Sequence, residues 1–529
     1  MIPVIPALKA VPQLQASSHR PSTPRPHLIC LAWLSGYLCK SLHMSSSKWQ
    51  SKIPQRATIC SWRAQAKSCR WRILMSNKAA TSRGTISNIA KMFLYPDWLR
   101  HEAIIVVSGF VVMFTTCGQI FTFGVYQALY ETMAKEPDTP FTGNSSAKIS
   151  LIGTLGIALM SLGGPLAMAW SRVYSPRLVI IAGSITFGIG YILASFSKTL
   201  WQFAITQGIL CGIGTCLSYV PTMAVAPTWF NKHRALAMGI IISGSGVGGM
   251  IWPPVLRALI TKVGVQYTLR ISACITILIT PLAGWVLKWE PTIERQVQIQ
   301  TQGSSRSRRW TNIPLVNWQV ASSRRFIVQA VGSFLQSAAY STPLFYLAAF
   351  ARSLGYSENT AANFITLSNA ANFASRIVIG WAADRFGRLN ALFVTTLLTA
   401  VAIFTFWLPS AVIDPTSGSK ANILFIVFVV FYGCFASTYI SLFPASLIEL
   451  FGVQHYTSIN GALYLVRGIG ALLGIPLTGL LIPTSSGLVS ANNYDRAALT
   501  CGVLLFTASI ASLWLRIEVS IGSRWHWKA

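Results

Sequence analysis

Three polar residues at helical spacing interrupt an apolar stretch of this sequence. Asn369, Asn372 and Arg376 follow one another at intervals of three and four residues, so a helix places them on one face. A guanidinium near the middle of a bilayer costs at least about 2.5 to 3.5 kcal/mol, so this face must meet a cavity, a partner or a substrate rather than lipid. Because a guanidinium can donate two parallel hydrogen bonds to one carboxylate, we expect Arg376 to bind an anionic substrate. The alternative is an arginine that is permanently paired with another helix.

A second helical face carries another cation. Asn460, Tyr464 and Arg467 are spaced at i, i+4 and i+7. We expect them to line the same cavity, which two uncompensated arginines would give a positive potential. The alternatives for Arg467 are a position at a helix end, from which it reaches the membrane surface, and bonds to backbone carbonyls. Further candidates for the lining are Gln329, Gln336, Tyr340, Tyr432 and Tyr439.

Catalytic and metal chemistry are not expected. The 13 acidic residues and 7 histidines can all be placed away from the centres of the apolar segments, so no side chain is available there to carry a proton. Proton coupling would then require that the proton travels on the substrate. No CxxC pair, no nucleophile and base at helical spacing and no glycine-rich ATP-binding loop occur. We predict no catalytic residue, no metal site, no cofactor and no drive by ATP hydrolysis.

The composition is that of a membrane protein. Of 529 residues, 53% are hydrophobic and 10% are charged, whereas a soluble chain carries about a quarter charged residues. The net charge of +29 comes from a basic N-terminal region and from short loops, which is typical of membrane topology and not of a nucleic-acid groove. The expected partners are a lipid bilayer and a small-molecule substrate, without nucleic acid. The sequence predicts no oligomeric state.

The apolar segments predict the fold class, an all-α polytopic membrane protein with twelve transmembrane helices in two six-helix halves. Each segment has about the 20 residues that a helix needs to cross a bilayer. Because twelve is even, both termini lie on one side, and the basic connection after the sixth segment places that side in the cytosol. We expect the plasma membrane before the vacuolar membrane. The segments are 103–126, 149–170, 178–196, 201–223, 235–259, 267–287, 326–350, 360–382, 389–408, 423–445, 458–482 and 497–515.

The regions outside these segments are basic or polar. Residues 1–98 form a basic arm with no acid before Asp97, which we interpret as a disordered cytosolic arm that touches anionic lipid. A transit peptide and a misassigned start are the alternatives. The expected divisions are the arm 1–98, the first half 99–287, a cytosolic loop 288–325, the second half 326–516 and a cytosolic tail 517–529.

One glycosylation sequon begins at Asn144, between the first two apolar segments. It predicts a glycosylated outer loop and agrees with cytosolic termini.

The loop after the segment that holds Arg376 reads GWAADRFGR, from Gly380 to Arg388. This stretch resembles the loop signature of the major facilitator superfamily. A carboxylate at a helix end can pair with arginines and with the positive end of a neighbouring helix. We therefore expect the loop to hold a cytosolic gate in one state; a plain basic loop with a turn glycine is the alternative. The gating residues are Gly380, Asp384, Arg385, Gly387 and Arg388.

The same spacing occurs once in the first half. Gly164 precedes Arg172 by the eight residues that separate Gly380 from Arg388, but Met168 stands in place of the aspartate. The pattern indicates an internal parallel repeat that has decayed in the first half.

The fifth segment is similar to the signature of the monocarboxylate transporter family, in its fungal branch. It reads Trp229-Phe230, KHRALAMG up to Gly239 and GSGVGG from Gly244, and its glycines let a neighbouring helix pack closely. The resemblance implies that Arg376 is the carboxylate-binding residue. Asn372, however, stands where animal members carry an acid, and the first segment lacks their lysine.

These patterns predict a secondary active or facilitative transporter of small organic anions such as monocarboxylates, which works by alternating access. The runner-up is an efflux transporter for a fungal secondary metabolite, and a membrane sensor without transport is a distant alternative.

Overall fold

The computed structural model describes residues 97–295, 318–413, 418–482 and 490–522. The chain divides into two units, Met1–Leu94 and Tyr95–Ala529, and the described residues belong to the second. Residues 1–96 of the predicted arm, most of the predicted loop 288–325 and the last residues of the predicted tail lie outside them, whereas Asp97 and Trp98 of the arm begin the first helix. The described residues form helices and loops, with no strand among them.

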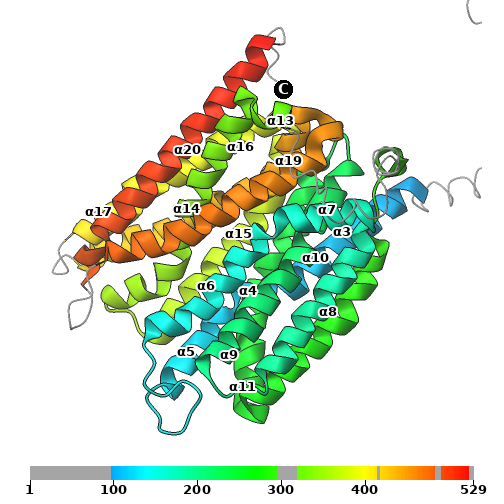
Figure 1. The fold of residues 1–529 in the computed structure, drawn as a ribbon. Helices are drawn as coiled ribbons and strands as arrows, with labels where there is room; N and C mark the ends of the chain where they lie inside the picture. The colour runs from blue at the N-terminus through cyan, green and yellow to red at the C-terminus, as the bar shows by residue number, and fades with distance from the viewer. Residues whose placement is uncertain (1–96, 296–317, 414–417, 483–489, 523–529) are drawn as a thin grey trace, which may run out of the picture. The chain divides into compact units, whose positions relative to one another are not determined.

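The first half is built from helices that match the first six predicted segments (Figure 1). The short π-helical turns η1 and η2 continue the α-helices on either side of them, whereas the 3-10 turn η3 ends α10. The elements are α3 (Asp97–Val112), η1 (Met113–Cys117), α4 (Gly118–Phe121), α5 (Phe123–Met133), α6 (Ser146–Leu162), α7 (Gly164–Val173), α8 (Pro176–Ala194), α9 (Leu200–Phe203), η2 (Ala204–Leu210), α10 (Cys211–Val225), η3 (Ala226–Thr228) and α11 (Arg234–Val286).

The second half repeats this pattern of long helices. Its last helix continues through Gly522, so part of the predicted tail 517–529 is helical. The elements are α13 (Trp318–Ala321), α14 (Arg324–Ser353), α15 (Glu358–Phe386), α16 (Arg388–Ala402), η4 (Ile403–Trp407), α17 (Leu408–Val412), α18 (Gly418–Ala436), α19 (Thr438–Leu480), η6 (Ala491–Tyr494) and α20 (Asp495–Gly522).

Two glycines divide the longest helices. Gly264 in α11 has φ 83° and Gly452 in α19 has φ 73°, a region of backbone space that residues with a side chain rarely adopt. Each glycine lies between two predicted segments, so α11 and α19 each contain the turn from one span to the next.

The helices cover all twelve predicted segments. Seven stretches, among them Arg234–Val286 and Lys420–Leu480 with a turn inside each, are long and apolar enough to cross a membrane. The pair α6 and α7, bent by 46°, adds one more. Although α14 and α15 have 30 and 29 residues, they are too polar to be among the seven. These two polar helices carry several of the predicted site residues.

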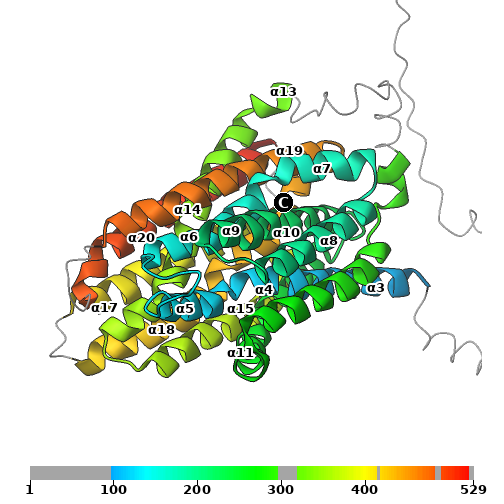
Figure 2. The same cartoon turned by 60° about the horizontal axis from the view of Figure 1, so that its bottom comes forward.

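The two halves lie side by side, the blue-to-green helices α3 to α11 in one group and the light-green-to-red helices α13 to α20 in the other (Figures 1 and 2). They meet where α11 packs on α15, and where α19 packs on α6 and α7. The predicted site residues lie along these two contacts.

Candidate substrate site and gate

Glycines bring the backbone of α15 against α11. A Cβ atom on Gly239 of α11 would overlap the backbone oxygen of Arg376, and one on Gly380 of α15 would lie 2.7 Å from the oxygen of Ala235. No side chain fits at either place, so the two helices touch directly. This contact places the polar face of α15 on the first half.

The Arg376 side chain is 2% exposed and reaches across this contact. Its Nη1 donates hydrogen bonds to the backbone oxygen of Ile242 and, over 2.8 Å, to the Ser245 hydroxyl of α11. Its Nε has no partner. Arg376 is thus held by neutral groups, and its positive charge is not compensated by them.

The two asparagines of the same face behave differently. Asn372, one turn before Arg376, is buried and its Oδ1 has no hydrogen-bond partner. Asn369 is half-buried and its Nδ2 donates a long hydrogen bond of 3.5 Å to the Gly249 oxygen of α11. The helical face predicted from spacing therefore exists, and in this structure it lies against the first half.

The second predicted cation is buried among aromatic rings of the second half. The Arg467 guanidinium carbon lies 5.4 Å from the ring centre of Tyr439 and 4.9 Å from that of Phe443. The side chain is 6% exposed and Nη1 has no hydrogen-bond partner. Cation–π contacts stabilise a guanidinium without using its N–H groups, so this donor remains free.

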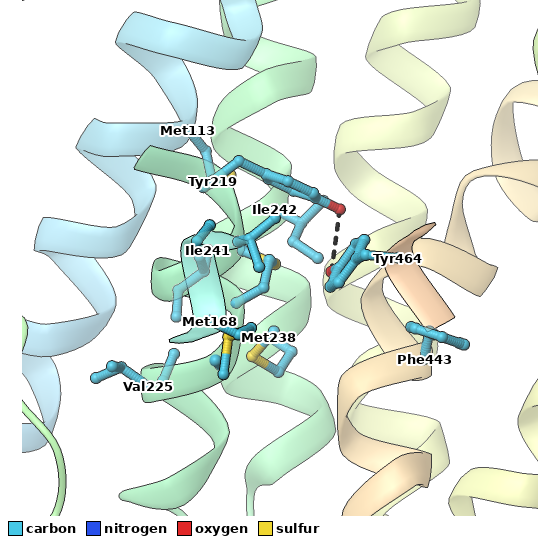
Figure 3. Packing of buried hydrophobic residues seen from close by; sticks show 14 of the residues in the cluster. Met113, Met168, Tyr219, Val225, Met238, Ile241, Ile242, Phe443 and Tyr464 are labelled. Atoms are coloured by element: carbon cyan, nitrogen blue, oxygen red, sulfur yellow. Dashed lines mark hydrogen bonds between the residues drawn. The ribbon is translucent and has the colours of Figure 1, made fainter. Parts of the chain in front are cut away.

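Asn460 and Tyr464, which share the predicted face with Arg467, are less exposed than this arginine. The Tyr464 hydroxyl of α19 donates a hydrogen bond of 3.3 Å to the Tyr219 hydroxyl of α10 (Figure 3). Asn460 is fully buried, and neither of its amide atoms has a partner.

Helix α14 contacts both cations. The Tyr340 side chain interacts with Arg376, and one turn earlier the Ser337 hydroxyl donates a hydrogen bond of 2.7 Å to the backbone oxygen of Arg467. The two guanidiniums therefore belong to one region between the halves. Tyr340 was among the predicted lining residues, whereas Tyr219 and Ser245 were not. Each stands among other polar residues of its segment, such as Ser218 and Ser243, so no spacing distinguished it.

The predicted gate lies at one end of this contact, here called the Asp384 end. The Asp384 carboxylate accepts hydrogen bonds from the backbone N–H groups of Ala235 (3.0 Å) and Leu236 (2.8 Å), in the first turn of α11. The Nε and Nη2 of Arg388 each donate to it over 3.0 Å. A negative charge at the start of a helix is stabilised by its free N–H groups and by the helix dipole.

The remaining gate residues are arranged around this carboxylate. Arg388 also donates to the Asn231 oxygen over 3.0 Å and lies 3.9 Å from the Glu449 carboxylate. Gly387 has φ 101° and ends α15. Arg385 instead points to the ring faces of Trp381 (5.7 Å) and Phe386 (5.9 Å). The structure therefore brings Arg388, and not Arg385, to Asp384.

The equivalent residues of the first half lie against α19. The Arg172 Nη1 donates to the Ser458 hydroxyl over 3.0 Å. Met168 is buried and would lie 3.2 Å from a Cβ on Gly461. The first-half copy of the loop thus packs through an apolar side chain where the second-half copy uses a carboxylate.

Two further predictions concern metal binding and glycosylation. In the described parts of the chain no group of three His, Cys, Asp or Glu side chains could hold a metal ion. Asn144 lies half-buried in the loop after α5, and its Nδ2 donates to the Phe141 oxygen over 3.2 Å. Its glycosylation stays a prediction.

Comparison with known proteins identifies the family. Residues 105–419 and 330–524 match the model of the Major Facilitator Superfamily. An MFS-type transporter of Gibberella moniliformis is 26% identical over 431 residues, 82% of this chain and 94% of the relative. The agnestins efflux protein AgnL12 of Paecilomyces divaricatus is 29% identical over 420 residues, which cover 79% and 88%.

A third relative is the aspyridones efflux protein apdF of Emericella nidulans, 26% identical over 79% of this chain and 80% of the relative. Among solved structures, the proton:xylose symporter XylE is 14% identical with a TM-score of 0.57, over 79% of this chain and 96% of that chain. At this identity XylE shows the fold alone. The chain belongs to the major facilitator superfamily of membrane transporters, and the predicted fold class is confirmed.

Proposed function

We propose that this protein transports an organic anion, which binds between Arg376 and Arg467, by alternating access. The observation that carries the proposal is the unmatched charge of these two buried guanidiniums. Arg325 and Arg388 form ion pairs with acidic side chains, whereas neither buried arginine pairs with an acid of the described residues. Because a buried cation without a counter-charge is costly, an anionic substrate supplies what the protein lacks.

The contacts of Arg376 suggest how binding is coupled to movement. Its bonds to Ile242 and Ser245 tie the second half to the first. A carboxylate forms stronger, charge-assisted bonds than these neutral acceptors, so a bound anion would draw the guanidinium away from α11. The first link between the halves then depends on the substrate.

The gate supplies the second link. In this structure hydrogen bonds from Ala235 and Leu236 to Asp384, and from Arg172 to Ser458, hold the halves together at the Asp384 end. We take this as the state closed at that end. Opening it requires α11 to leave the Asp384 carboxylate, so rocking of the halves exchanges one set of contacts for another.

Export of a metabolite is the direction that the relatives favour. Two of them are named as efflux proteins, for agnestins and for aspyridones. We therefore place an anionic secondary metabolite first among the substrates. A small monocarboxylate is the second candidate, because residues 229–253 resemble the signature of the monocarboxylate transporter family. Residence in the plasma membrane with cytosolic termini remains part of the proposal.

Counterflow in proteoliposomes tests this function. Vesicles loaded with an organic acid should accumulate the labelled acid, and Arg376→Gln should reduce the rate at least about ten-fold, since one charge-assisted interaction is lost. The matched control is Arg257→Gln, an exposed arginine of α11. Equal transport of a neutral analogue, or full activity of Arg376→Gln, would contradict the proposal. A sensor without transport would show no counterflow with any acid.

A further inference from the structure

The proposed site contains two cations, Arg376 and Arg467, and their number indicates how many negative charges the substrate carries. We propose that the substrate carries two acidic groups, one bound by Arg376 and the other by Arg467. The inference rests on the proposed function and goes beyond it, because transport of an organic anion requires only one of these contacts.

Each guanidinium has one nitrogen without a hydrogen-bond partner. The Nε of Arg376 and the Nη1 of Arg467 are buried atoms without a hydrogen-bond partner. The other contacts of Arg376 are to a carbonyl and to the neutral hydroxyls of Ser245 and Tyr340, and those of Arg467 are to two ring faces. Because buried donors are normally paired, both atoms indicate a missing acceptor.

The two arginines belong to different helices that meet at the contact between the halves. Arg376 belongs to α15 and Arg467 to α19, and α14 contacts both of them, through Tyr340 and Ser337. A ligand with two acidic groups on a chain of suitable length can then reach both guanidiniums. A single carboxylate satisfies one arginine with its two oxygens, which leaves the second cation buried and unmatched.

Charge balance then decides between classes of anion. A neutral metabolite leaves two buried charges uncompensated, a monoanion leaves one and a dianion leaves none. The two guanidiniums also repel each other, and each acidic group of a dianion reduces this repulsion because it is attracted by both cations. The aromatic rings around Arg467, Tyr439 and Phe443, add an apolar wall beside the second anionic position.

The Asn372 and Gln336 side chains lie near the two cations and carry no charge. Asn372 lies one turn from Arg376, and Gln336 lies one turn from Tyr340 on α14. Their amide oxygens, Oδ1 and Oε1, are buried without partners. Neutral amides leave the positive charge of the site unchanged, so the balance above holds for the whole face.

The test compares matched ligands in the wild-type protein. Reconstituted protein is offered linear dicarboxylates of increasing chain length, each beside its mono-amide, which has the same shape and one charge less. We expect at least one dicarboxylate to compete for counterflow about ten-fold better than its mono-amide. Equal competition by both members of every pair would overturn the inference while leaving anion transport intact.

Two variants then assign the second charge. Arg467→Gln should weaken the preferred dicarboxylate at least about ten-fold and its mono-amide much less, so the preference disappears. Arg467→Lys keeps the charge and should retain the preference, and Arg257→Gln serves as the control. If Arg467→Gln weakens both ligands equally, Arg467 does not bind the second acid. Absence of competition by any acid would instead refute the proposed function itself.

Discussion

The carboxylate of Asp384 lies 2.8 Å from the backbone nitrogen of Leu236, and 148 residues of sequence separate the two. This hydrogen bond joins the end of α15 to the first turn of α11, and so the second half to the first. Four N–H groups at the start of an α-helix have no partner within the helix. The first N–H groups of α11 need an acceptor from outside the helix. Asp384 is that acceptor while the gate is closed, and water takes its place when the gate opens.

Removing the charge of Asp384 should loosen this end. Asp384→Asn keeps one acceptor oxygen but loses the charge-assisted bonds to Ala235, Leu236 and Arg388, a cost of about 1.5 to 3 kcal/mol. Met223 is fully buried, and its backbone oxygen accepts a hydrogen bond of 3.0 Å from Tyr456 of the second half. A cysteine at this position would report opening in a background without native cysteines. Its alkylation should become faster in Asp384→Asn than in Glu136→Gln. The second variant is the control, because it neutralises an exposed acid in the loop after α5. Equal rates would show that Asp384 does not hold the gate.

The two arginines of the loop should differ in their importance. Arg388 donates to Asp384 and to the Asn231 oxygen, whereas Arg385 is exposed and lies beside ring faces. Arg388→Gln should lower stability by about 1.5 to 3 kcal/mol, and Arg385→Gln by less than about 0.5 kcal/mol, as at other surface positions. Thermal unfolding of both variants in one detergent measures the difference. Equal destabilisation would mean that Arg385 has a partner in another conformation.

The hydroxyl pair of Tyr219 and Tyr464 should couple the two halves. The hydroxyls are 3.3 Å apart and the rings meet edge to face, with centres 5.4 Å apart. Each Tyr→Phe change leaves the ring and removes one hydroxyl. A double-mutant cycle on unfolding should therefore give a coupling energy of about 0.5 to 1.5 kcal/mol. Additive effects of the two changes would show that this hydrogen bond contributes nothing.

Sequence spacing predicted the helical faces of the site but not their partners. Asn369, Asn372 and Arg376 share a face because helical geometry depends only on sequence separation. The contact of Arg376 with Ser245 depends instead on the register between α15 and α11, which no local pattern determines. The rings of Tyr439 and Phe443 reach Arg467 for the same reason, through the packing of one part of α19 on another.

The glycines of the fifth segment show the same limit. Their sequence predicted close packing, and the structure shows that they serve two neighbours. Gly239 and Gly249 face α15, whereas Cβ atoms on Gly244 and Gly248 would meet Phe110 of α3 and Gly118 of α4. Sequence could not separate the two faces, because it did not show which helices lie on either side of α11.

The α11–α15 contact gives the last prediction. A methyl group on Gly239 would overlap the backbone oxygen of Arg376, a position that cannot move without shifting the whole of α15. Gly239→Ala should therefore destabilise the protein by about 1 to 3 kcal/mol, as overpacking does, and should also slow counterflow because Arg376 is displaced. Gly124 of α5 is the matched control, since a Cβ there meets no atom within 4 Å. Gly124→Ala should leave both quantities unchanged or raise stability slightly by about 0.4 to 1 kcal/mol. If the two variants unfold at the same temperature, α11 and α15 are not in close contact in the resting protein.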